Sequence, residues 1–250
     1  MRSKRPRKAH KKKMLRAKNL EGGDEGSDES AAHLPCDSPI GKVRGLDDLK
    51  ISKYFARGSV LFVEGQRPRG VYVLCEGRAK VSIGSADGKT LILRIAQPGD
   101  LLGVNAVLSG EPYSATAETI ERCRIDFISR QDLLKLLERD KKACLGVAHA
   151  LGHTLSRVIQ QSQLLFVSQS ATEKVARLLI RWCDELGKRT PEGIEINSGL
   201  THQEMAQMIC TSRETVTRVL NEFKRGQIVG LFNGTILVRN RKALATVARC

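Results

Sequence analysis

The sequence predicts an α+β fold with an N-terminal roll of short strands, one long helix, and a C-terminal unit of helices and a β-hairpin. Three observations predict this order. Residues 57–128 contain short runs of β-branched and aromatic residues separated by turn signals. Residues 141–168 repeat apolar side chains at alternating spacings of four and three. The last third holds helix-capping patterns and an Asn-Gly dipeptide, the strongest two-residue hairpin signal.

The β-rich segment supplies the candidate strands of the first domain. Its runs are SVLFVEG, GVYVLCEG, RAKVSIG, TLILRIA, SATAETI and RCRIDFI. Gly65, Pro68, Gly77 and the segments ADGK and QPGD mark the turns between them. Several short strands at this spacing are typical of a sandwich or barrel-like roll. We therefore expect a β-roll domain over residues 39–140.

After the segment SRQDLLKLLERD the pattern becomes helical, and we expect one helix over residues 141–169. Its heptad positions are occupied by Cys144, Ala148, Leu151, Leu155, Val158, Ser162 and Leu165. Such a repeat is typical of a coiled-coil contact, so we predict a homodimer in which Leu151, Leu155, Val158 and Leu165 form the apolar seam. The alternative is an ordinary core helix that packs on the β domain.

The remaining residues, 170–250, predict a winged helix-turn-helix. Ser170 to Glu173 has the form of a capping box, and a helix follows it as far as Gly187. A loop, RTPEG, and a short strand, IEINSG, come next. LTHQEMAQMI is a helix with a second capping box from Thr201 to Glu204, and SRETVTRVLNEFKRG is another helix. IVGLF-NG-TILVR then reads as a hairpin.

The second of these helices has two distinct faces on a helical wheel. Its apolar side chains, Val216, Val219, Leu220 and Phe223, share one side. The other side presents Arg213, Glu214, Thr217, Arg218, Asn221 and Lys224. Arginine pairs with guanine and a carboxylate accepts from cytosine in the major groove, so this face suits direct base contacts. The alternative for Glu214 is structural, since Thr211 to Glu214 also has the form of a capping box.

The charge of the chain favours an anionic partner. The formal net charge is +15, and residues 1–18 carry ten Lys or Arg whereas residues 21–30 carry five acids. Nucleic acid is the first choice of partner and a membrane surface the second. Residues 1–38 lack apolar periodicity and are expected to be a disordered tail. This tail is either a non-specific nucleic-acid contact or a solvated extension, with translation from Met14 as a further alternative.

Other function classes find little support in the sequence. No segment is apolar for the roughly 18 residues that a membrane span needs, and no secretory signal is evident, so we expect a cytoplasmic protein. The seven cysteines show no C-x-x-C pair, which favours reduced, structural thiols over a disulfide framework or zinc site. His149 and His153 are four residues apart and could hold a metal, but they fall outside the heptad seam and are expected as surface or domain-packing histidines. No metal or cofactor is expected. The common enzyme motifs are absent, so we expect no enzyme.

The segment LTHQEMAQMICTSRETVTRVLNEFKRGQIV resembles the helix-turn-helix of the cyclic-AMP receptor and fumarate-nitrate regulator (CRP/FNR) family of bacterial transcription factors. YVLCEG followed by GDLLG resembles its jelly-roll-like, cyclic-nucleotide-binding domain. The resemblance implies that Arg213, Glu214 and Arg218 contact bases, with a further contact from Thr217. It implies phosphate contacts from Thr201, Gln203, Ser212 and Lys224, and a weaker one from His202, which stands where many members have Arg. It also implies RNA polymerase as a partner and a TGTGA-like half-site in a palindrome.

Family members that bind cyclic AMP carry Gly-Glu-Leu and, about ten residues later, Arg-Ser-Ala. Here Gly103 is followed by Val104 and Asn105, and Tyr113 precedes Ser114 where the arginine would stand. Burying a phosphate without a cation is costly, so ordinary cyclic-AMP binding is not expected and the effector is unknown. The second function class is a non-specific architectural DNA-binding protein, which preference for a TGTGA palindrome would exclude.

Overall fold

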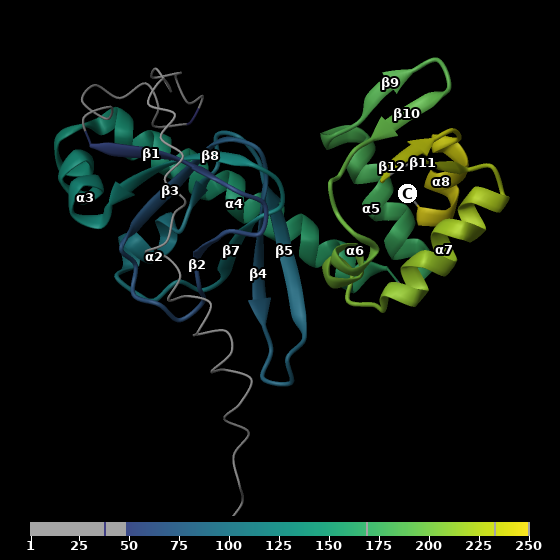
Figure 1. Cartoon of the computed structure of the whole chain (residues 1–250), viewed down its shortest axis with the longest axis horizontal. Coiled ribbons are helices and arrows are strands. Elements are labelled where there is room, and N and C mark those ends of the chain that lie inside the picture. Colours follow the sequence, from purple (N-terminus) through teal and green to yellow (C-terminus); the bar gives the residue numbers. More distant parts are fainter. Residues whose placement is uncertain (1–37, 39–48, 169, 233, 250) are drawn as a thin grey trace, which may run out of the picture.

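The computed structural model describes residues 38, 49–168, 170–232 and 234–249 (Figure 1). A body of strands lies at one end, a body of helices with a small sheet lies at the other, and the long helix α4 runs between them (Figure 1). This order confirms the predicted fold class. The predicted disordered tail, residues 1–38, lies outside the described residues except for Ser38.

The first body is a β-roll of two antiparallel sheets. One sheet has the order β1 (Lys50–Phe55), β8 (Cys123–Ser129), β3 (Gly70–Glu76) and β6 (Leu101–Leu102). The other has the order β2 (Val60–Phe62), β7 (Thr116–Thr119), β4 (Ala79–Gly84) and β5 (Thr90–Ala96). Apolar side chains such as Leu74, Leu102 and Ile125 are fully buried within the roll.

Two elements of the roll were not predicted. Strand β1 lies before the expected β segment. Three of the six residues in KISKYF are polar, and pairing with β8 holds the segment as an edge strand. Helix α2 (Val104–Ser109) occupies the segment that the sequence suggested only as a ligand cassette. Gly103 and Gly110 bound this helix in left-handed conformations, with φ of 79° and 76°, which glycine adopts without strain.

Two helices follow the roll, α3 (Arg130–Arg139) and α4 (Lys141–Val167). Asp140 separates them, and its carboxylate accepts hydrogen bonds from the first backbone N–H groups of α4. Near its start α4 packs on the roll through Ala143, Val147 and Ala150, and near its end Leu164 joins the core of the second body. The helix therefore contacts both domains.

The second body has helices on a four-stranded antiparallel sheet. The helices are α5 (Ala171–Glu185), α6 (His202–Met208), α7 (Arg213–Arg225) and α8 (Arg241–Ala248). The strands are β11 (Val229–Phe232), β12 (Thr235–Val238), β10 (Gly193–Ile196) and β9 (Lys188–Thr190), in that order across the sheet. The predicted hairpin is confirmed, since Phe232 pairs with Thr235 across a two-residue turn.

One helix was not predicted from the sequence, and two sequence expectations were wrong. Helix α8 was missed, although Asn240 caps it by accepting from the backbone N–H of Ala243. Arg189 and Thr190 were expected in a loop but lie in β9, which pairs with β10, because the partner strand supplies the hydrogen bonds that local sequence does not specify. Cys75 was expected as a free buried thiol, but it is disulfide-bonded. Separately, none of the helices in the described ranges has the length and hydropathy that a membrane crossing requires.

Candidate nucleic-acid interface

The α6–turn–α7 segment is built by local hydrogen bonds that the sequence specifies. At the start of α6 the predicted capping box is present, because Thr201 and Glu204 exchange side-chain and backbone hydrogen bonds. At its end the N–H of Thr211 donates to the carbonyl of Ala206, as in a Schellman motif. Cys210 lies between them with φ of 52°, a conformation that usually favours glycine.

Helix α7 is oriented by its buried face. Val216, Val219 and Leu220 are fully buried in the core of the second body, and Phe223 is nearly so. Ser212 caps the helix by accepting from the N–H of Thr215, so the alternative capping box from Thr211 to Glu214 is wrong. Glu214 is therefore not needed as a cap and stands exposed on the polar face.

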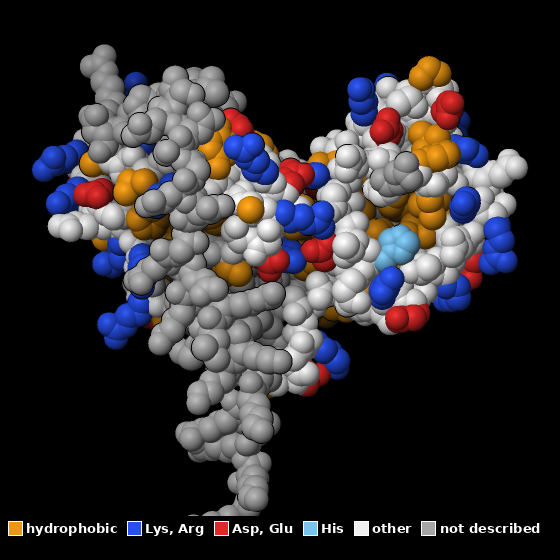
Figure 2. All heavy atoms as spheres, in the orientation of Figure 1, with side chains coloured by type: hydrophobic (Ala, Val, Ile, Leu, Met, Phe, Trp, Pro, Cys, Tyr) orange, Lys and Arg blue, Asp and Glu red, His pale blue; other side chains and the backbone are white. Residues whose placement is uncertain are grey.

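The opposite face of α7 forms a shallow, open pocket. It is lined by Arg213, Glu214, Thr217, Arg218, Asn221 and Arg225. All four predicted base-contacting residues therefore lie together on one surface. Figure 2 shows Lys and Arg side chains along the outer edge of the second body, where α7 lies in Figure 1. Arg225 was missed as a site residue, although its spacing of seven from Arg218 places it on the same face.

Three of these side chains already have partners within the chain. A guanidinium nitrogen of Arg218 lies 2.7 Å from a carboxylate oxygen of Glu222, one helical turn away. The Thr217 hydroxyl lies 2.9 Å from Nδ1 of His202 and 2.9 Å from the carbonyl oxygen of Arg213. Hydrogen bonds from its own backbone N–H and from Ser212 hold the pKa of the Glu214 carboxyl below its usual value, so this acceptor is ionised at neutral pH.

The predicted phosphate-contacting residues surround this face. Thr201, Gln203, Ser212 and Lys224 are exposed at the ends of α6 and α7. His202 is half-buried instead, and it contacts Thr217. Burial, with the nearby charge of Arg213, lowers the pKa of His202, so its imidazole is neutral at physiological pH. His202 thus links α6 to α7 through Thr217, a residue predicted to contact a base.

The segment that would bind a cyclic phosphate is filled by a tyrosine. Tyr113 is buried, its ring stacks on Phe62 with centroids 4.1 Å apart, and its hydroxyl donates to the carbonyl of Gly70 at 2.6 Å. A Cβ added to Gly103 would lie 2.6 Å from the tyrosine ring, so the two segments are in close contact. Asn105 donates to the Ser114 hydroxyl at 3.1 Å, and Val104 is buried. The cassette residues therefore contact one another.

Known family models match both the β-roll and the helix-turn-helix body of this chain. A family model for the Crp-like helix-turn-helix domain matches residues 173–247, and one for the cyclic nucleotide-binding domain matches residues 52–140. The chain belongs to the CRP/FNR family of transcription regulators. The CRP/FNR resemblance of the sequence is confirmed, and so is its DNA-binding helix-turn-helix.

Similar members of the CRP/FNR family cover most of the chain. The cyclic AMP receptor protein of Thermus thermophilus is 29% identical over 209 residues, which are 80% of this chain and 91% of that protein. The CRP-like cAMP-activated global transcriptional regulator of Mycobacterium tuberculosis is 26% identical over 196 residues, 78% and 87% of the two chains. A crystal structure of a CRP-family transcriptional regulator from T. thermophilus is 27% identical, with a TM-score of 0.68 over 79% of this chain and 97% of that one.

The described residues can also be searched for a possible metal site. Among the residues that the structure describes, no group of three or more His, Cys, Asp or Glu side chains is arranged to hold a metal ion. His149 and His153 are both exposed on α4, as expected from their place outside the heptad.

Proposed function

We propose that this protein is a dimeric, sequence-specific regulator that binds a palindromic, TGTGA-like DNA site through α7. The observation that carries the proposal is the exposed face of α7, where three guanidiniums, an ionised carboxylate and a hydroxyl share one surface. Arg213 and Arg218 have the fork geometry that pairs with guanine, and Glu214 can accept from cytosine. A carboxylate opposes non-specific phosphate binding, so its presence favours direct base contacts.

The dimer would form along one exposed stripe of α4. Leu145, Leu155, Ile159 and Phe166 expose about half or more of their surface and follow a heptad spacing. Leu155 belongs both to this stripe and to the seam predicted from the sequence. The other three residues of the predicted seam are not part of the stripe. Leu151 and Leu165 pack partly against the chain's own cores, and Val158 is half-buried. The apolar stripe, rather than the residues beside it, is the surface we assign to the partner helix.

A dimer along α4 would place two copies of α7 on successive turns of DNA. Half-sites one helical turn apart lie about 34 Å from one another, which fixes the spacing that the dimer must match. Changes in the β-roll would adjust α4 and so this spacing. We place the protein in the cytoplasm, where RNA polymerase is the further partner expected of a regulator at a promoter.

We expect binding-site selection from random DNA, with purified protein and no added ligand, to return a palindrome of TGTGA-like half-sites. At physiological salt the affinity for that site should exceed the affinity for random DNA by about 1,000-fold or more. The salt must be held constant, because counterion release changes both affinities. A ratio near one would instead support the second candidate, a non-specific architectural protein that uses its formal net charge of +15.

We also infer that cyclic AMP is not the effector of this protein. Tyr113 occupies the cassette where a phosphate would need a cation, and the cassette residues bond to one another. Isothermal titration calorimetry should therefore show no micromolar binding of cyclic AMP. The same titration with a known cyclic-AMP receptor serves as a positive control. Saturable micromolar binding to this protein would contradict the inference.

A further inference from the structure

The β-roll touches the DNA-binding body through charged side chains that the sequence did not link to it. Arg78, immediately before β4, donates to the carbonyl oxygens of Asn197 and Ser198 at 2.8 Å each. Its other nitrogens pair with both carboxylate oxygens of Glu121 at 2.9 and 2.8 Å. The guanidinium thus holds the loop that leads into α6 against the roll.

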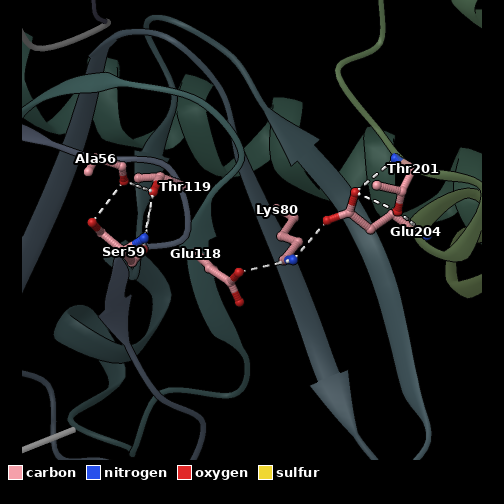
Figure 3. Close-up of polar contacts among 7 residues, drawn as sticks. All are labelled: Ala56, Ser59, Lys80, Glu118, Thr119, Thr201 and Glu204. Carbon is pink, nitrogen blue, oxygen red and sulfur yellow. Dashed lines mark hydrogen bonds and ion pairs between the residues drawn. The ribbon is translucent and has the colours of Figure 1, made fainter. Parts of the chain in front are cut away.

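Lys80, two residues further along β4, reaches α6 itself (Figure 3). Its ammonium nitrogen lies 2.9 Å from Oε1 of Glu204 and 3.1 Å from Oε1 of Glu118 on β7. The side chains of Lys80 and Glu204 are only 17% and 13% exposed, so solvent screens this pair less than an ordinary surface pair. Ile92 on the neighbouring strand β5 is fully buried in the core of the DNA-binding body.

The other oxygen of the same carboxylate holds a residue of the proposed DNA surface. Oε2 of Glu204 accepts from the backbone N–H of Thr201 at 2.9 Å and from its hydroxyl at 3.0 Å (Figure 3). A continuous chain of contacts therefore runs from Lys80 through Glu204 to Thr201. Because Thr201 is exposed and faces solvent, a DNA phosphate that approaches its hydroxyl also approaches the Glu204 carboxylate.

Both members of the pair are charged at neutral pH. Burial raises the pKa of Glu204, but hydrogen bonds from Thr201 and Lys80 outweigh it and the net pKa lies below the usual value. Burial lowers the pKa of Lys80, but its bonds to Glu204 and Glu118 raise the net pKa above the usual value. Without Lys80 the charge of the Glu204 carboxylate would lose this compensation and would repel a phosphate that approaches Thr201.

We propose that Lys80, a residue of the β-roll, is a positioning residue for the DNA contact at Thr201 and acts through Glu204. It does so by neutralising the carboxylate and fixing its orientation, so that the β-roll influences DNA affinity directly as well as through α4. The inference rests on the proposed function, because it takes Thr201 as a phosphate contact.

The test is a double-mutant cycle of DNA affinity with Lys80→Gln, Glu204→Gln and the double variant. Glutamine at position 204 can keep the capping box while removing the charge, so α6 retains its start. We expect Lys80→Gln to weaken binding to the selected palindrome about five- to tenfold in the wild-type background. In the Glu204→Gln background the same change should alter affinity less than about twofold, because no carboxylate remains to be neutralised.

Lys89→Gln is the matched control, since Lys89 lies in the same β4–β5 hairpin, is 85% exposed and pairs with Asp87 rather than with α6. It removes the same charge and should leave affinity within about twofold of wild type. If a thermal melt shows that Lys80→Gln is not folded at the assay temperature, Lys80→Met replaces it in the cycle, because methionine keeps the buried methylene stem. No loss on Lys80 replacement, or an equal loss in both Glu204 backgrounds, would overturn the proposal.

The cycle is also run on random DNA at low salt, where phosphate contacts dominate. This separates the two proposals. If the wild-type protein shows no preference for the palindrome but the Lys80 effect still depends on Glu204, the sequence-specific function fails and the positioning role stands. If the palindrome is preferred and the Lys80 effect is absent, the positioning role alone fails.

Discussion

Arg218→Ala is expected to weaken binding to the selected palindrome by about 1–3 kcal/mol for each half-site and to relax base preference at one position. Arg218 lies in the middle of the exposed face of α7, and its partner in the free protein is Glu222 at 2.7 Å. That pair is exposed and one turn apart, so exchanging it for a guanine costs only about 0.3–0.5 kcal/mol. Fluorescence anisotropy with the palindrome and with single-base variants would measure both effects.

Arg139→Ala is the control for Arg218→Ala. Arg139 is exposed at the end of α3, at the opposite end of the molecule from α7, so its removal changes the net charge equally (Figure 1). It should leave site affinity and base preference unchanged. If Arg218→Ala weakened binding to the palindrome and to random DNA by the same factor, Arg218 would be a phosphate contact and the assignment of direct base contact would fail.

Leu155→Glu is expected to weaken dimerisation about 100-fold or more, because each protomer loses a buried leucine worth about 1.5–3 kcal/mol and gains a charge that faces its copy. Leu155 is 60% exposed in the single chain, so the fold of the protomer should survive. Sedimentation velocity over a range of concentrations would measure the dissociation constant. Binding to the palindrome should fall in parallel, since one α7 contacts only one half-site.

Gln160→Glu is the matched control on the same helix. Gln160 is exposed on α4 but lies away from the apolar stripe, so a glutamate there should leave the dimer intact. Glutamate substitutions on α4 also distinguish the exposed apolar stripe from the seam predicted by the heptad pattern. If Leu151→Glu dissociated the dimer without unfolding it while Leu155→Glu and Phe166→Glu did not, the partner helix would lie on the originally predicted seam instead.

The recognition helix could be predicted from sequence because its determinants are local. The spacing of Val216, Val219 and Phe223 fixes which face is buried, and a helical period then places Arg213 and Arg218 together on the other. The hairpin that follows was equally predictable, since Asn-Gly specifies a two-residue turn. The capping box at Thr201 could also be predicted from the sequence, because its two partners are only three residues apart.

Helix α8 and the role of Arg225 were missed although their signals are local, whereas the other features that the sequence did not predict depend on residues distant in the chain. Strand β1 exists because β8, more than 60 residues later, supplies its hydrogen bonds. The position of the apolar stripe on α4 depends on which side of the helix the two cores cover, and a heptad pattern alone does not specify this. The heptad pattern predicts a seam, and the burial of α4 by other elements is the basis on which we propose different members for it.

The sequence by itself therefore determined the fold class, the family and the chemistry of α7, because helical period, capping and turn formation act over a few residues. Only the tertiary structure decided that Tyr113 fills the cassette against Gly103, that His202 bonds to Thr217 and that Lys80 reaches Glu204. Each of these contacts joins separate elements, and a pair of charges or rings brought together by folding leaves no periodic signal in the chain. The link between the β-roll and the DNA surface is accordingly a property of the fold.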